Sequence, residues 1–295
     1  MMRSAMFRLS KQNFRLTCAV LCLLGMCAAQ EIRAPQDVSA GNDATISTTG
    51  SGRATFYLFG PGTSRKSDVN LGDPVQLQGD DLQHAGRYFA VLCSGECHRA
   101  SFFVSAAKPS SLTFLVHPSR VPVAEGDAIS GVALPFDKYR NLVLTPQTIN
   151  FELSTGKASV LSHSVSTKDG IAWFRSASGK SAGALQVVAS LNDLSARRAV
   201  QQVASDPCNL RITGQRNTKG ILVQTEPVHD CAGNPVPDGT IVTFTATANG
   251  EKSTVDAPIK QDIARAEILA PGPATISAAS GVVMGNELRM EGEAR

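Results

Sequence analysis

The chain has 295 residues, of which 42% are hydrophobic, 5% aromatic and 18% charged, with 28 Lys and Arg against 25 Asp and Glu. At about 100–200 residues per domain this length predicts two or three domains, and the ordinary hydrophobicity argues against wholesale disorder and against a polytopic membrane protein. The charges are sparse and form no long run of one sign, which argues against a protein that binds nucleic acid by electrostatics.

The N-terminus has the pattern of a signal peptide. Four basic residues precede the apolar run Leu16–Met26, which is followed by Cys27-Ala28-Ala29. Signal peptidase recognises this order of basic, apolar and small residues, so residues 1–29 are predicted to be removed by cleavage after Ala29. The run is too short for a membrane anchor, which needs about 20 apolar residues. An uncleaved amphipathic N-terminus is one alternative, and a lipoprotein would need a small residue where Met26 precedes Cys27.

Export would place the protein in the periplasm, at the cell surface or outside the cell, and we expect no membrane span in the mature chain. The mature chain would keep 24 basic and 25 acidic residues. No excess of positive charge would then remain to attract DNA or anionic lipid.

Four cysteines follow the leader, and an even number in an oxidising compartment predicts disulfide bonds. Cys93 and Cys97 are separated by Ser-Gly-Glu, a turn-like triplet that allows a bridge across one hairpin. Cys208 and Cys231 are then left to pair with each other, and closing their loop of 24 residues would contribute about 3 kcal/mol. A four-cysteine zinc site is the alternative, but it would need a second closely spaced pair.

From Gln30 onward the recurring hydrophobic period is two, and we find no long helical pattern. Short runs rich in β-branched and aromatic residues, bounded by Gly, Pro, Asn, Asp and Ser, are typical of strands in all-β sandwiches. The clearest runs are Ala54–Phe59, Tyr88–Leu92, Thr113–Val116 and Thr240–Thr245. The stretch Leu191–Val203 could form a short helix, but a module needs a last strand there to close its sheet, so we expect a strand.

An internal repeat sets the expected module boundaries. Phe136–Val143 aligns with His229–Val236 at an offset of 93 residues, and without a gap Phe151 falls on Phe244. This period is about the length of one seven-stranded sandwich. We therefore expect three modules, at residues 30–107, 108–205 and 206–295, joined stiffly by short linkers that contain no flexible Gly/Ser tract.

The two aligned modules share a set of residues at matching turns and strand ends. In the third module these are Asp230, Gly233, Asn234, Pro235, Val236, Asp238, Gly239 and Phe244. In the second module they are Asp137, Asn141, Val143, Phe151, Thr167, Asp169, Gly170 and Ala172. This pattern resembles the bacterial Ig-like (Big-1-like) repeats of the invasin and intimin type. The resemblance implies three tandem immunoglobulin-like β-sandwiches, in which the matched Asn-Pro and Asp-Gly positions shape turns.

The first module resembles an Ig-like domain more loosely. Ala85-Gly86-Arg87-Tyr88 lies ahead of Cys93, as in a tyrosine corner, where a Tyr hydroxyl bonds to backbone across a connection between sheets. The antibody-type pair of cysteines around a Trp is missing, since Trp173 belongs to the second module.

No motif of the chain indicates an enzyme, and we expect no catalytic residue, no cofactor and no metal. The five histidines lie outside the GxSxG, HExxH and His-x-His patterns, and the densest acidic spots have the character of turns. Asp230, Asn234 and Asp238 crowd one turn and could offer oxygen atoms to calcium. Tight turns use the same residue types, however, and the spacing matches no EF-hand loop.

The sequence favours an exported, non-enzymatic protein that serves as an adhesion, spacer or protein-interaction module of the envelope or extracellular space. One alternative is a carbohydrate-binding module, in which Phe56, Tyr57 and Phe59 would contact the ligand. The wider aromatic cluster adds Phe102 and Phe103, and strand alternation buries about half of it. Another alternative is an accessory subunit of an envelope assembly, suggested by the lack of an anchor. We expect a protein or an envelope or matrix component as partner, with a glycan as the second choice.

Overall fold

The computed structural model describes residues 31–156 and 158–292, so the predicted signal peptide lies outside the described residues. In this part of the chain the regular structure is β-strand, apart from one short 3₁₀-helix, η1 (Gly79–Leu82). None of the described segments forms a helix long and apolar enough to cross a bilayer.

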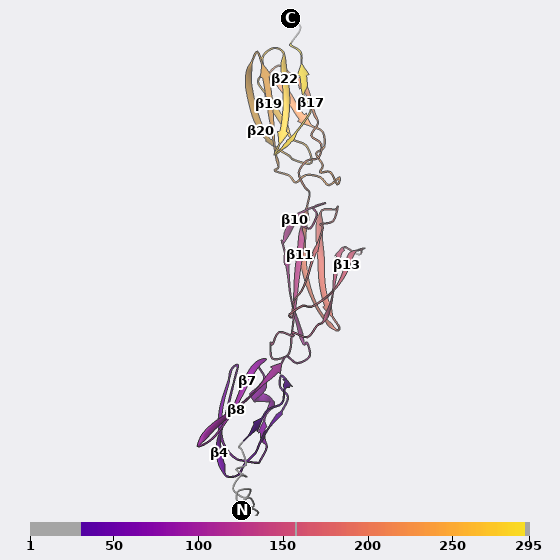
Figure 1. Cartoon of the computed structure of the whole chain (residues 1–295). Helices are drawn as coiled ribbons and strands as arrows, with labels where there is room; N and C mark the ends of the chain where they lie inside the picture. Colours follow the sequence, from indigo (N-terminus) through magenta and orange to yellow (C-terminus); the bar gives the residue numbers. More distant parts are fainter. Residues whose placement is uncertain (1–30, 157, 293–295) are drawn as a thin grey trace, which may run out of the picture. The chain divides into compact units, whose positions relative to one another are not determined.

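The strands form three β-sandwiches in chain order, and each pairs a three-stranded sheet with a larger one (Figure 1). We call them the first, second and third module. In the first module the small sheet has the order β1 (Ile32–Arg33), β3 (Ala44–Thr48), β6 (Val75–Leu77). Its large sheet has the order β2 (Asp37–Ser39), β8 (Glu96–Ser105), β7 (Gly86–Ser94), β4 (Arg53–Gly60), β5 (Thr63–Asn70).

The second module repeats this arrangement. Its small sheet has the order β14 (Ala172–Ser176), β11 (Ile129–Phe136), β9 (Ser111–His117). Its large sheet has the order β10 (Arg120–Pro122), β16 (Leu194–Val203), β15 (Gly183–Leu191), β12 (Thr148–Thr155), β13 (Ala158–Ser166). The stretch that was ambiguous between helix and strand is thus the end of β15 and the whole of β16, which confirms the predicted closing strand.

The third module has the small sheet β17 (Ile212–Arg216), β18 (Ile221–Thr225), β21 (Arg265–Ile268). Its large sheet has the order β20 (Glu251–Pro258), β19 (Ile241–Ala248), β22 (Ala274–Ser280), β23 (Val283–Met284), with β24 (Leu288–Met290) also paired to β22. The tandem β-sandwich fold predicted from the sequence is therefore present.

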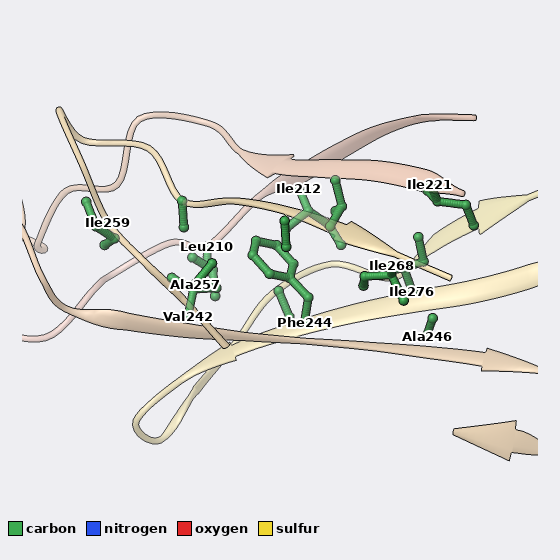
Figure 2. Close-up of a cluster of buried hydrophobic side chains, with 14 of the residues drawn as sticks. Leu210, Ile212, Ile221, Val242, Phe244, Ala246, Ala257, Ile259, Ile268 and Ile276 are labelled. Atoms are coloured by element: carbon green, nitrogen blue, oxygen red, sulfur yellow. The ribbon is translucent and has the colours of Figure 1, made fainter. Parts of the chain in front are cut away.

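Each module has its own hydrophobic core, because alternate strand residues point between the two sheets. In β19 the alternation places Phe244 fully inside, where side chains from both sheets of the third module surround it (Figure 2). Phe151 takes the same place in β12 and contacts the ring of Phe174 at 4.6 Å between centroids. The residues that the repeat aligned are thus matching core anchors.

The first module contains the predicted tyrosine corner. Tyr88 is fully buried, and its hydroxyl donates a hydrogen bond of 2.9 Å to the carbonyl oxygen of His84. Burial raises the pKa of this phenol above its ordinary value. The bond ties the start of β7 to the loop before it, as in other Ig-like sandwiches.

By its contacts the chain divides into two compact units. One comprises the first module together with Phe136–Val143, and the other comprises Ser110–Pro135 and Leu144 onward. Phe136–Val143 belongs to the first unit because the ring of Tyr139 packs on the core of the first module. The ring fills the space where Gly41 has no side chain. The module boundaries expected from the sequence stay a prediction.

Candidate functional site

The two aligned turns of the repeat adopt the same closed geometry. In the first unit the amide of Asp137 donates to the carbonyl oxygen of Asn141 at 3.0 Å, and 93 residues later Asp230 donates to Asn234 at 2.9 Å. A β-bridge flanks each turn, Phe136 to Leu142 in one case. We call each Asp with its Asn an Asp–Asn clamp, for the contacts described next.

The carboxylate of Asp230 is the centre of the second clamp. One oxygen accepts the backbone N–H groups of Ala232 and Asn234, both at 2.8 Å. The other accepts the N–H of Ser205 at 3.1 Å and the side-chain amide of Asn234 at 3.0 Å. Ser205 lies in the linker that follows β16, so the carboxylate joins its own turn to that linker.

Asp137 makes the same set of bonds in the first unit. One oxygen accepts the N–H groups of Tyr139 at 2.9 Å and Asn141 at 2.8 Å. The other accepts the linker N–H of Ala107 at 2.9 Å and the side-chain amide of Asn141 at 2.8 Å. The repeat therefore preserves a hydrogen-bond network as well as a turn.

The asparagine of each clamp reaches a second loop. The amide of Asn234 donates to the carbonyl of Lys180 at 2.8 Å and accepts the N–H of Ala182 at 2.9 Å, both in the loop before β15 of the second module. A side-chain amide that donates and accepts at once fixes both position and orientation. In the second unit, a side chain of the third module thus binds the backbone of the preceding module.

Asn141 does the same within the first unit. Its amide donates to the carbonyl of Gln83 at 2.7 Å and accepts the N–H of Ala85 at 2.8 Å. Ala85 directly precedes β7, as Ala182 directly precedes β15. Both clamps therefore recognise the same loop of a sandwich.

Both aspartates are almost completely buried. Burial acts to raise the pKa of Asp230, but the hydrogen bonds from Asn234, Ser205 and Ala232 outweigh it and hold the pKa below its ordinary value. For Asp137 the bonds from Asn141, Ala107 and Tyr139 likewise outweigh burial and lower the pKa. Each carboxylate is therefore charged at neutral pH.

The clamp occupies the oxygen atoms of two candidate calcium ligands, Asp230 and Asn234. The oxygens of Asp230 face N–H groups rather than a vacant site, and the Asn234 oxygen is taken by Ala182. Asp238 accepts the N–H of Gln261 at 2.9 Å and belongs to another turn. Among the residues that the structure describes, no cluster of three acidic, His or Cys side chains is placed to hold a metal.

Both predicted disulfides are confirmed. Cys93 and Cys97 bridge β7 and β8, where they are direct cross-strand partners. Cys208 and Cys231 bridge the segment before β17 to the clamp turn, one residue after Asp230. The second bridge thus fastens the turn that carries the clamp.

The three aromatic residues proposed as ligand contacts lie on two faces of one strand. Phe56 is fully buried in the core of the first module and so cannot contact a ligand at the surface. Tyr57 and Phe59 point to the opposite face, with their ring centroids 6.1 Å apart. Of the wider cluster, Phe102 is buried and Phe103 is exposed.

No family model and no curated protein sequence matches the chain. Among solved structures, the adhesin FdeC of Escherichia coli is similar with a TM-score of 0.63 and 16% identity, over 90% of this chain and 97% of that chain. Invasin, a bacterial integrin-binding protein, is similar with a TM-score of 0.53 and 11% identity, over 90% of this chain and 59% of that chain.

The chain has the tandem Ig-like fold of the invasin-type adhesins. This confirms the resemblance read from the turn residues of the repeat. At these identities the likeness concerns the fold, so binding activity has to be argued from the residues of this chain.

Sequence reasoning found the clamp residues but gave them a smaller role. Asp137, Asn141, Asp230 and Asn234 were assigned to turns, and their bonds to a linker and to a second loop were missed. The available signal was the recurrence of both Asp and Asn at the same offset, although Arg140 replaces the turn glycine of the other copy. A turn alone does not need a buried carboxylate.

Proposed function

We propose that the protein is an exported, non-enzymatic adhesion, spacer or protein-interaction module of the cell envelope or extracellular space. Its sandwiches would act as stiffly joined building blocks that present a binding surface. The role of a spacer depends on joints that resist bending, and the role of an adhesin depends on a surface that can bind a partner.

The second Asp–Asn clamp is the observation that carries this proposal. Asn234 binds backbone of the second module, and Asp230 binds the linker through Ser205. Directed bonds at two points of one joint oppose both bending and twisting, and they add to the stiffness that a short linker provides. The recurrence of the network at Asp137 and Asn141 argues that it serves the modular architecture.

Two further observations support the proposal. Two disulfides fit an oxidising compartment outside the cytoplasm. FdeC is an adhesin and invasin binds integrin, so the tandem fold is used elsewhere for attachment.

The replacement Asn234→Ala tests the spacer role. It removes the bonds to Lys180 and Ala182 while the carboxylate of Asp230 keeps its backbone donors. We expect a broader distribution of distances between the second and third modules. Spin labels on p-acetylphenylalanine at Glu152 and Glu251 would measure that distribution by pulsed dipolar spectroscopy without disturbing the disulfides.

The matched control is Asn217→Ala. The side chain of Asn217, like that of Asn234, makes two hydrogen bonds to backbone groups, here by accepting the N–H groups of Lys219 and Gly220, but it lies away from the joint. The control variant should leave the distribution unchanged. An unchanged width in Asn234→Ala, with both modules folded, would contradict a stiffening role for the clamp.

A further inference from the structure

Aromatic rings gather on the outer face of the large sheet of the first module. Phe59 on β4 and Phe89 on β7 are direct cross-strand partners and are 45% and 40% exposed. Tyr57 adjoins Phe59 on the same strand, and Phe103 on β8 is 44% exposed. We call Tyr57, Phe59, Phe89 and Phe103 the aromatic face; its strands β4, β7 and β8 lie side by side (Figure 1).

The sandwich fold does not require these rings. The outward positions of the matching strand in the second module hold Asn150 and Glu152 on β12. In the third module they hold Thr243 and Thr245 on β19. Polar side chains suffice there because this face of the sheet is solvated. The aromatic face is therefore a property of the first module alone.

Basic side chains border the rings. Lys66 is the cross-strand partner of Tyr57 and places its ammonium 5.8 Å from the ring centroid. Arg87 is the partner of Phe103, and Arg99 lies on the same face of β8. Within residues 31–156 and 158–292 none of these three cations forms an ion pair.

The positive charge around the rings is opposite in sign to the net charge of the first module. Between Glu31 and Ala107 there are eight acidic and six basic residues. The two acids that share the face, Asp37 and Asp68, accept hydrogen bonds from hydroxyls at 3.4 Å. Three unpaired cations around exposed rings complement a partner that carries acidic groups around an apolar patch.

The chemistry of the rings favours a protein as that partner. Three of the four rings are Phe, which offers apolar area and no hydrogen-bonding group for sugar hydroxyls. Aromatic residues and Arg are the types enriched where proteins bury surface on one another. The Cys93–Cys97 bridge cross-links β7 and β8, which carry Phe89 and Arg99, and so restricts the motion of these two strands before binding.

We propose that the aromatic face is a docking surface for an acidic protein partner, with the rings burying apolar area and Lys66, Arg87 and Arg99 pairing with carboxylates. This inference rests on the proposed interaction role, for which it names the surface and the class of partner. It does not depend on the stiffness of the joints.

A display library of random twelve-residue peptides, selected against the full disulfide-bonded chain, tests the proposal. The enriched peptides should combine Asp or Glu with aliphatic or aromatic residues. A synthetic peptide from that pool should bind more than tenfold more weakly to Phe59→Ser/Phe89→Ser and to Arg99→Glu. Raising NaCl should weaken binding to the parent chain, because it screens exposed charges.

Val282→Ser/Met284→Ser is the matched control, since these apolar residues of the third module are 89% and 68% exposed. It should bind the peptide like the parent chain. If the double Phe variant fails to fold, Lys66→Glu replaces it, because Lys66 lies on the edge strand β5 and is exposed.

Three outcomes would overturn the docking surface. The library could yield no acidic peptide, or the peptides could bind the double Phe variant, Arg99→Glu and the parent chain equally. Alternatively, soluble alginate or heparin could bind the aromatic face while peptides do not, which would assign it to an anionic glycan. Any of these would leave the distance measurement on Asn234→Ala, and with it the spacer role, as a separate test.

Discussion

Replacing Asp230 by Ala is expected to destabilise the third module by about 3 kcal/mol, because it leaves several buried N–H donors without an acceptor. The lost bonds include those from Ala232, Asn234 and Ser205. The free energy of unfolding of this module can be followed by amide exchange in urea, using the amides of β19 and β22 as reporters.

Asp238→Ala provides the comparison. Asp238 is exposed and accepts one backbone N–H, from Gln261, so its loss should cost about 1 kcal/mol or less. Equal effects of the two replacements would mean that the network around Asp230 adds nothing beyond an ordinary turn.

The same carboxylates predict a dependence of stability on pH. Because the folded-state pKa values of Asp137 and Asp230 are lowered, their contribution is fully present above the unfolded-state pKa of about 3.9. It is lost as the pH falls through the folded-state values. Urea midpoints followed by NMR should therefore drop below about pH 4, and in Asp230→Ala the third module should show a shallower drop.

Removal of the Cys208–Cys231 bridge has the second large expected effect. Its sequence separation of 23 predicts a loss of about 3 kcal/mol in the third module when both cysteines become Ser. The shorter Cys93–Cys97 loop predicts about 2 kcal/mol in the first module. Amide exchange of the intact chain separates the two modules, and each pair should affect only its own. A loss spread over both modules would contradict independent cores.

The sequence was sufficient for features that depend on local pattern. Alternation located the strands, the spacing of Cys93 and Cys97 predicted a hairpin bridge, and Tyr88 was placed in a tyrosine corner. The closing strand β16 followed from the requirement that a sheet be completed. Neighbours along the chain determine the strands, the hairpin bridge and the tyrosine corner, whereas β16 follows from the completion of its sheet.

Features that depend on pairing between distant segments could not be predicted. Alternation alone does not say which side of β4 faces the core, so Phe56 and Phe59 were equal candidates until the register placed one inside. Phe89 was not proposed as a ligand contact, because its place beside Phe59 follows from the pairing of β4 with β7. The hydrogen bond from Asn234 to Lys180 joins residues 54 positions apart, so no local sequence pattern indicates it.

The membership of Phe136–Val143 in the first unit bears on how the protein can be dissected. A fragment cut after Ala107 would lose Tyr139 from above Gly41 and would leave Gln83 and Ala85 without their amide partner. Its end would expose unpaired backbone groups and apolar surface. The solubility of such a fragment would therefore say little about the intact molecule. A recombinant fragment should therefore include Phe136–Val143 with the first module, or should contain the first two modules together.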